Sequence, residues 1–180
     1  MNVNEVKIVK KVKNKLTSVD LKYYIMSYYR YIRHWPVVAT EVNTLKSFYA
    51  DVIAADNQEV VEVEIKTTRE DFLQEFTTKQ SKHNIYLDFD TTNQHKLSKQ
   101  AYQLMPNRLF YAAEPHLTSL MVKTLKGTPY GVIEVDWRRA IPAQVIKSAN
   151  QLHNIFPKQL YNRAVLRATS ELVSLYKELL

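Results

Sequence analysis

The segment from Glu59 to Thr68 constrains the fold more than any other part of this sequence, because aliphatic and charged residues alternate along it. The two faces of such a strand carry different residues: Val61, Val63 and Ile65 on one, and Glu62, Glu64 and Lys66 on the other. A second hydrophobic run, Tyr49 to Ala55, ends three residues before it, and a loop of that length is typical of a hairpin. The sequence therefore predicts a β-hairpin that brings Asp51 opposite Glu64 and Lys66.

Burying the charged face of this hairpin costs free energy unless its side chains bind a ligand. A divalent cation with a phosphate group is the natural candidate, because Mg²⁺ prefers hard oxygen ligands and needs only one or two carboxylates. We therefore interpret Asp51 and Glu64 as ligands of Mg²⁺ or Mn²⁺, with the carbonyl oxygen of Ile65 as a third. Lys66 lies ~6.6 Å along the strand from Glu64. Its ammonium group is placed to orient an attacking water or to meet negative charge that develops on a phosphate.

Other charged residues near the hairpin receive a structural interpretation. Glu62 shares the face of Glu64 but lies further from Lys66, so we interpret it as solvated or as an acid that supports the site. The five histidines have no spacing typical of a metal site, and we interpret His83 and His95 as surface residues.

The remaining pattern predicts an α/β fold, in which a mixed central sheet is flanked by helices on both faces. Strands are expected at residues 37–42, 49–55, 60–67, 108–113 and 130–135, with a small extra strand at 84–90. Helices are expected at 17–33, after Thr68, at 94–104, at 118–125, from Pro142, and at 158–180. We interpret the chain as one domain with three parts: a basic N-terminal arm (1–16), an α/β core (17–136) and a helical C-terminal extension (137–180).

Composition excludes several classes of site. The chain of 180 residues has no cysteine, so disulfides, zinc fingers and thiol nucleophiles are excluded. It has two glycines and no glycine-rich loop, which excludes dinucleotide-binding and Walker-type phosphate loops. No apolar run approaches the ~20 residues that a membrane helix needs. The lysines of the first 15 residues are not followed by the apolar core of a secretory signal. We therefore expect a cytoplasmic protein without membrane segments.

The formal net charge of +7 favours an anionic partner, and nucleic acid is the first candidate. The basic side chains that we interpret as candidate contacts to DNA are Lys10, Lys11, Lys13, Lys96, Arg138 and Arg139. The alternative for the lysine-rich arm is a solvated terminus, and for the two arginines it is pairing with nearby acids.

Five stretches of the chain together resemble the PD-(D/E)xK nuclease superfamily, and within it the MmcB-like DNA repair proteins. They are Ala50–Ile53, Val63–Thr68, Arg69–Phe72, Asn107–Ala112 and Tyr130–Ile133. The resemblance spans roughly residues 37–135. Ala50 stands where the literal motif has proline.

The resemblance implies a restriction-endonuclease-like core and metal-dependent hydrolysis of phosphodiester bonds in DNA. Carried onto matching positions, it makes Asp51 and Glu64 metal ligands and Lys66 the catalytic lysine. Glu41 lies where such enzymes often place an additional catalytic acid.

Two other function classes stay open at this stage. One is a nucleic-acid-binding module that keeps the fold without catalysis. The other is an interaction protein whose last helix, 158–180, packs on a partner or forms a homodimer.

Overall fold

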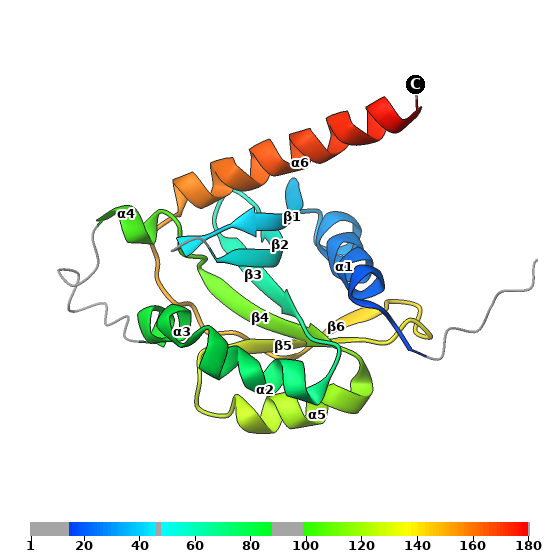
Figure 1. Cartoon of the computed structure of the whole chain (residues 1–180), viewed down its shortest axis with the longest axis vertical. Coiled ribbons are helices and arrows are strands. Elements are labelled where there is room, and N and C mark those ends of the chain that lie inside the picture. Colours follow the sequence, from blue (N-terminus) through cyan, green and yellow to red (C-terminus); the bar gives the residue numbers. More distant parts are fainter. Residues whose placement is uncertain (1–14, 46–47, 88–98, 180) are drawn as a thin grey trace, which may run out of the picture.

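Six strands form one mixed sheet in the order β1-β2-β3-β4-β5-β6 (Figure 1). They are β1 (Val37–Asn43), β2 (Tyr49–Ala55), β3 (Val60–Ile65), β4 (Arg108–Ala113), β5 (Gly131–Val135) and β6 (Ala143–Lys147). The pairs β1–β2, β2–β3 and β5–β6 are antiparallel, whereas β3–β4 and β4–β5 are parallel. The computed structural model describes residues 15–45, 48–87 and 99–179.

Helices cover both faces of this sheet, as the hydrophobic pattern predicted. They are α1 (Ser18–Ser27) with a π-helical continuation η1 (Tyr28–Ile32), α2 (Arg69–Thr78), α3 (Gln80–Leu87), α4 (Lys99–Tyr102), α5 (Pro115–Thr124) and α6 (Lys158–Leu179). In Figure 1, α1 lies on one side of the sheet, α2 and α5 lie on the other, and α6 crosses β1 and β2 and continues past them. The architecture is therefore α/β, with a C-terminal helix.

The core explains the alternation along β3. Val61, Val63 and Ile65 pack against α1 through Leu21 and Ile25. On the opposite face, Phe72 of α2 and Met121 of α5 pack over β4 and β5, and Leu160 and Ala164 of α6 pack over β1 and β2. The charged residues of β3 face this second side, between the two groups of helices.

Side-chain caps fix where two helices begin. The Thr17 hydroxyl accepts a hydrogen bond from the amide of Asp20, and the Asp20 carboxylate accepts one from the amide of Thr17, which is a capping box. At α2 the Thr68 hydroxyl accepts from the amide of Asp71 at 3.1 Å. The predicted helix start directly after β3 is therefore confirmed.

Two predicted elements are wrong. In place of the helix expected from Pro142, the structure has β6, which pairs antiparallel with β5. Just before β6, the Pro142 carbonyl accepts a hydrogen bond from the amide of Asp136. The sheet therefore continues past residue 136, into the part of the chain expected to be purely helical. The extra strand expected at 84–90 is also wrong where it can be checked, because residues 84–87 belong to α3. Its remaining residues, 88–90, lie outside the described part.

Two further predictions from the sequence concern membrane segments and association through the last helix. In the described ranges, no helix combines the length and the apolar character needed to cross a membrane. The outer half of α6 exposes Leu172, Val173, Leu175 and Tyr176 to solvent. The homodimer expected through this helix stays a prediction.

The segment between β6 and α6 is anchored to the core through Asn107 and His153. The Asn107 side chain accepts from the amide of Val60 at 2.9 Å and donates to the carbonyls of His153 and Ile155, each at 3.0 Å. The buried His153 ring donates from Nε2 to the carbonyl of Met105 at 3.0 Å. Burial lowers the pKa of His153 below its ordinary value of 6.5.

We expect the free energy of unfolding to fall as the pH drops through about 6.5, because the unfolded chain protonates this histidine there and the folded chain resists. His153→Gln removes the titrating ring. It should therefore flatten the loss of stability between pH 7.5 and pH 5.5 in urea denaturation. His116→Gln, at an exposed position, is the control. The same pH dependence in His153→Gln as in the parent would contradict this assignment.

Candidate active site

The candidate site lies where β2 and β3 separate. The last pair of facing residues between these strands is Val52 with Val63. Beyond it, Asp51 Oδ2 accepts a hydrogen bond from the amide of Ile65 at 2.8 Å, so a carboxylate takes the place of a backbone acceptor. The next amide, that of Lys66, donates in turn to the carbonyl of Ala112 in β4, at 2.9 Å. The chain thus brings Asp51 directly beside the segment that carries Glu64 and Lys66.

The strands β1 and β2 are both irregular at this level. Glu41, in the middle of β1, has a φ of 50°, a left-handed conformation that is uncommon for residues other than glycine. The alternation of faces also breaks, because Ala39 and Val42 both join the cluster under α6, as do Ala50 and Ile53. Backbone strain of this kind costs about 1–3 kcal/mol and concentrates at functional sites.

Lys22 of α1 joins Glu41 to Asp51. Its Nζ lies 3.0 Å from Asp51 Oδ1 and also contacts Glu41 Oε1. The side chain of Lys22 is 19% exposed and that of Glu41 is 47% exposed. A cation therefore already bridges the two acids at the surface of the site.

A buried ion-pair cluster holds the charged face of β3 against α2 and α3. We define the buried cluster as Glu62, Glu64, Glu75, Lys66, Lys79 and Lys82, which comprise three carboxylates and three ammonium groups. Lys82 contacts Glu62 and lies 2.6 Å from Glu64 Oε1. Lys79 lies 2.8 Å from the other oxygen of Glu64 and 3.2 Å from Glu75.

Glu75 connects Lys66 to this cluster. Lys66 Nζ lies 2.7 Å from Glu75 Oε2 and 3.4 Å from Asp71. The other Glu75 oxygen lies 3.5 Å from His83 Nε2, and His83 Nδ1 is 3.0 Å from the hydroxyl of Tyr130. The position of the Lys66 ammonium group therefore depends on α2 and α3, although its backbone belongs to the end of β3.

The electrostatic surroundings differ among Asp51, Glu62 and Glu64. Burial and the neighbouring charge of Glu64 raise the pKa of Asp51, although the Ile65 amide and Lys22 act in the opposite direction. Burial likewise raises the pKa of Glu62 to about 7, with Glu64 adding to the effect. Burial alone would also raise the pKa of Glu64, but Lys82 and Lys79 together hold it below its ordinary value. A proton on this face would therefore reside on Glu62 before Glu64.

The donor atoms present are those that a hard divalent cation prefers. Carboxylate oxygens of Asp51 and Glu64 and the backbone carbonyl of Ile65 would be the ligands, and the pKa of Asp51 is raised first by burial and then by the charge of Glu64. Across the described residues, no group of three or more Asp, Glu or His side chains converges as a metal site. Two carboxylates suffice for Mg²⁺, which commonly keeps several waters. The half-buried Lys22 and Lys79 would have to release these oxygens.

The other residues singled out in the sequence lie apart from this centre. Arg138 is exposed and binds both oxygens of Asp136, at 2.7 and 3.0 Å. Arg139 lies 2.6 Å from Glu134. Both arginines therefore complement acids, as the structural alternative predicted. Four further candidate DNA contacts, Lys10, Lys11, Lys13 and Lys96, lie outside the described residues.

The sequence pattern indicated half of the buried cluster and did not indicate its neighbour His83. His83 was interpreted as a surface residue and Glu62 as solvated or supporting, but both are buried, at 4% and 0% exposure. Glu75, Lys79 and Lys82 were not singled out. Glu75 belongs to α2, Lys79 ends that helix, and Lys82 and His83 belong to α3, so no single helical period in the sequence marks them as neighbours.

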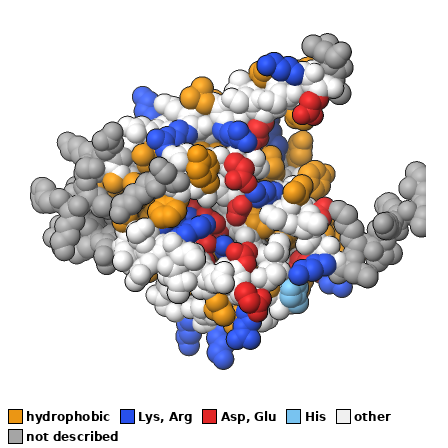
Figure 2. All heavy atoms as spheres, viewed as in Figure 1, with side chains coloured by type: hydrophobic (Ala, Val, Ile, Leu, Met, Phe, Trp, Pro, Cys, Tyr) orange, Lys and Arg blue, Asp and Glu red, His pale blue; other side chains and the backbone are white. Residues whose placement is uncertain are grey.

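Figure 2 shows acidic side chains gathered across the centre of the molecule, with basic side chains between them. Figures 1 and 2 share one view, in which this centre falls between α6 and α2.

Comparison with known proteins supports the fold alone. No family model matches the chain, and no curated protein matches it either. A solved structure of a protein of unknown function from Silicibacter pomeroyi is similar, with a TM-score of 0.63 and 16% sequence identity. The similarity covers 91% of this chain and 94% of that one.

We expect Lys82→Met to lower the free energy of unfolding by about 3–5 kcal/mol, because it leaves Glu62 and Glu64 buried without their shared cation. Urea denaturation at pH 8 measures this loss. Adding Glu62→Gln to the same chain should recover part of it by removing one uncompensated charge. Lys123→Met, on the exposed side of α5, is the control. A Lys82→Met protein as stable as the control would contradict the role given to this ion pair.

Proposed function

We propose that this protein is a metal-dependent nuclease of the PD-(D/E)xK superfamily with a restriction-endonuclease-like core, most similar to the MmcB-like DNA repair proteins. The observation that carries the proposal is the hydrogen bond from the Ile65 amide to Asp51. It holds an acid of β2 beside the glutamate of β3 and the lysine that directly follows this strand, at the point where the two strands part.

Each residue of the proposed site has a distinct task. Asp51 and Glu64 present carboxylates, and the Ile65 carbonyl lies between Glu64 and Lys66 along the chain. Mg²⁺ or Mn²⁺, when bound by these oxygens, would neutralise phosphate charge and lower the pKa of a bound water. Lys66, which Glu75 and Asp71 hold in place, supplies a positive charge for the scissile phosphate.

DNA is the proposed substrate. The net charge of +7 favours a polyanion, and the resemblance of the catalytic segments points to DNA rather than to a small phosphate ester. Glu41 joins the site as a second acid on β1, because Lys22 ties it to Asp51.

A second candidate is a nucleic-acid-binding module with the same fold and no catalysis. The observation that favours it is the neutrality of the buried cluster, in which lysines already compensate the three carboxylates. Binding of a divalent metal separates the two candidates, since a module of this second kind has no need of an ion.

We expect Asp51→Asn to abolish Mn²⁺ binding and cleavage of plasmid DNA while leaving the fold intact. The asparagine oxygen can still accept from the Ile65 amide, so the substitution removes the charge and keeps the hydrogen bond. Isothermal titration with Mn²⁺ and a cleavage assay with Mg²⁺ measure the two effects. Asp136→Asn, at a buried aspartate paired with Arg138, is the matched control. Metal binding and cleavage that persist in Asp51→Asn would remove the nuclease assignment.

Lys22→Met should tighten Mn²⁺ binding by about tenfold, because the ammonium group competes with the ion for Asp51 and Glu41. The readout is the dissociation constant at low ionic strength, with Lys126→Met as an exposed control. If Lys22→Met instead weakens binding, the lysine supports the site and does not compete for it.

A further inference from the structure

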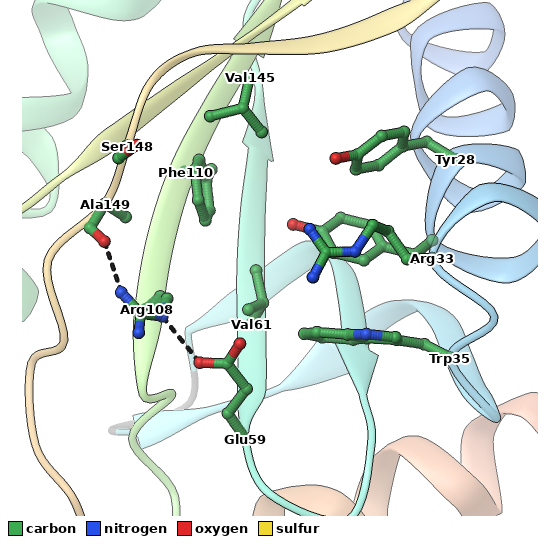
Figure 3. A pocket seen from close by; sticks show the side chains of 11 residues that line it. Tyr28, Arg33, Trp35, Glu59, Val61, Arg108, Phe110, Val145, Ser148 and Ala149 are labelled. Atoms are coloured by element: carbon green, nitrogen blue, oxygen red, sulfur yellow. Dashed lines mark hydrogen bonds and ion pairs between the residues drawn. The ribbon is translucent and has the colours of Figure 1, made fainter. Parts of the chain in front are cut away.

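A separate cavity lies on the α1 side of the sheet, on the face opposite the buried cluster. Its volume is about 410 Å³, and it is lined by η1 and the loop after it on one side and by β3, β4 and β6 on the other (Figure 3). Val61 and Phe110 contribute its floor. Val61 precedes Glu64 by three residues, ~10 Å along the strand, and points to the opposite face. The cavity therefore shares no residue with the candidate active site.

Aromatic rings make up much of its wall. Tyr28, Tyr29 and Trp35 come from one side and Phe110 from the other. The rings of Tyr29 and Trp35 lie 5.0 Å apart. Figure 3 shows Tyr28 and Trp35 directed from the helical side toward the strands, with space between them and Phe110. Flat apolar walls of this kind favour a flat ligand, because rings stack on one another.

The two arginines of the cavity differ in what they already bind. The Arg108 side chain is already paired within the protein. Its Nε lies 2.7 Å from Glu59, and its guanidinium group donates to the carbonyl of Ala149 at 2.6 Å. Arg33 is exposed and its side chain donates no hydrogen bond to any residue of the described ranges, and its guanidinium carbon lies 5.9 Å from the centre of the Trp35 ring. In Figure 3 its guanidinium group points into the cavity. A planar guanidinium with five free donors is suited to a phosphate or carboxylate group.

Glu59 adds a selective feature. One of its oxygens pairs with Arg108, and the side chain is 25% exposed at the cavity. The Glu59 carboxylate repels a ligand whose ring carries a negatively charged group. It accepts hydrogen bonds from an amino group on the ring. The complementary ligand is therefore a flat ring with amino groups that is linked to an anion able to reach Arg33.

We propose that this cavity binds a nucleotide, with its base between the aromatic walls, its amino group toward Glu59 and its phosphate on Arg33. A volume of about 410 Å³ lies within the range of small-ligand sites, roughly 300–1,000 Å³. The ligand is either a free mononucleotide or the terminal nucleotide of a single strand, since both present the same base and phosphate. The proposal goes beyond the nuclease function and does not depend on it.

Isothermal titration of the full chain in the presence of EDTA tests the proposal, because EDTA keeps divalent ions from the other site. The probes are dAMP, dGMP, dCMP and dTMP, a 5′-phosphorylated tetranucleotide, inorganic phosphate and deoxyadenosine. We expect dAMP, dGMP or dCMP to bind more tightly than dTMP, whose base lacks an amino group. Arg33→Gln should weaken this binding by about tenfold or more. Arg69→Gln, at an exposed arginine on α2, should leave it unchanged.

A second variant blocks the space without touching a charge. Val145→Trp, at a rim position that is 37% exposed, should fill the mouth of the cavity and abolish binding in a folded protein. Binding of the tetranucleotide without the mononucleotides assigns the site to a strand end, and binding of both assigns it to nucleotides in general.

Three results would overturn the proposal: no binding of any nucleotide, equal binding by Arg33→Gln, or inorganic phosphate and deoxyadenosine alone binding as tightly as dAMP. Asp51→Asn should bind nucleotides as the parent does, so failure here and failure of the nuclease assignment are distinguishable.

Discussion

The ion pair between Lys82 and the two glutamates of β3 is the interaction on which the rest of the structure depends. Glu62 and Glu64 lie on the face of a central strand that helices cover, and neither is more than 1% exposed. A buried carboxylate without a partner is strongly unfavourable. Lys82, itself fully buried, gives both acids a common cation and so permits α3 to pack there.

The same pairing connects folding to the chemistry proposed for the site. Lys79 bridges Glu64 and Glu75, and Glu75 holds Lys66, so the glutamate and the lysine of the motif are linked through the ion pair of Lys79 with Glu75. A change in the charge of any one of these side chains leaves a neighbouring buried charge without its partner. The orientation of Lys66 therefore depends on helices that follow it in the chain, and not on the hairpin that contains the motif.

The hydrophobic pattern was sufficient to predict five strands and the helices at α1, α2, α5 and α6, because each has one face in the core, but it did not predict α3. It failed at β6, an edge strand whose Val145 and Ile146 are both exposed, so that its apolar residues do not mark a buried face. It also failed at Lys82 and His83. Lysine is ordinarily exposed, and its burial here requires acids that lie 18 and 20 residues earlier in the chain. The proximity of Asp51 to residues 64–66 followed from the hairpin alone, whereas the strain at Glu41 and the bridge from Lys22 had no signature in the sequence.

The consecutive amides of Ile65 and Lys66 bond in opposite directions, one to the Asp51 carboxylate and the other to the carbonyl of Ala112. These two peptide groups lie where the antiparallel pairing of β2 with β3 gives way to the parallel pairing of β3 with β4. Elsewhere along β3, the hydrogen bonds to β2 and β4 join backbone amides and carbonyls, which do not titrate. Here one acceptor is an ionisable carboxylate, so protonation of Asp51 would weaken one of the links between β2 and the end of β3.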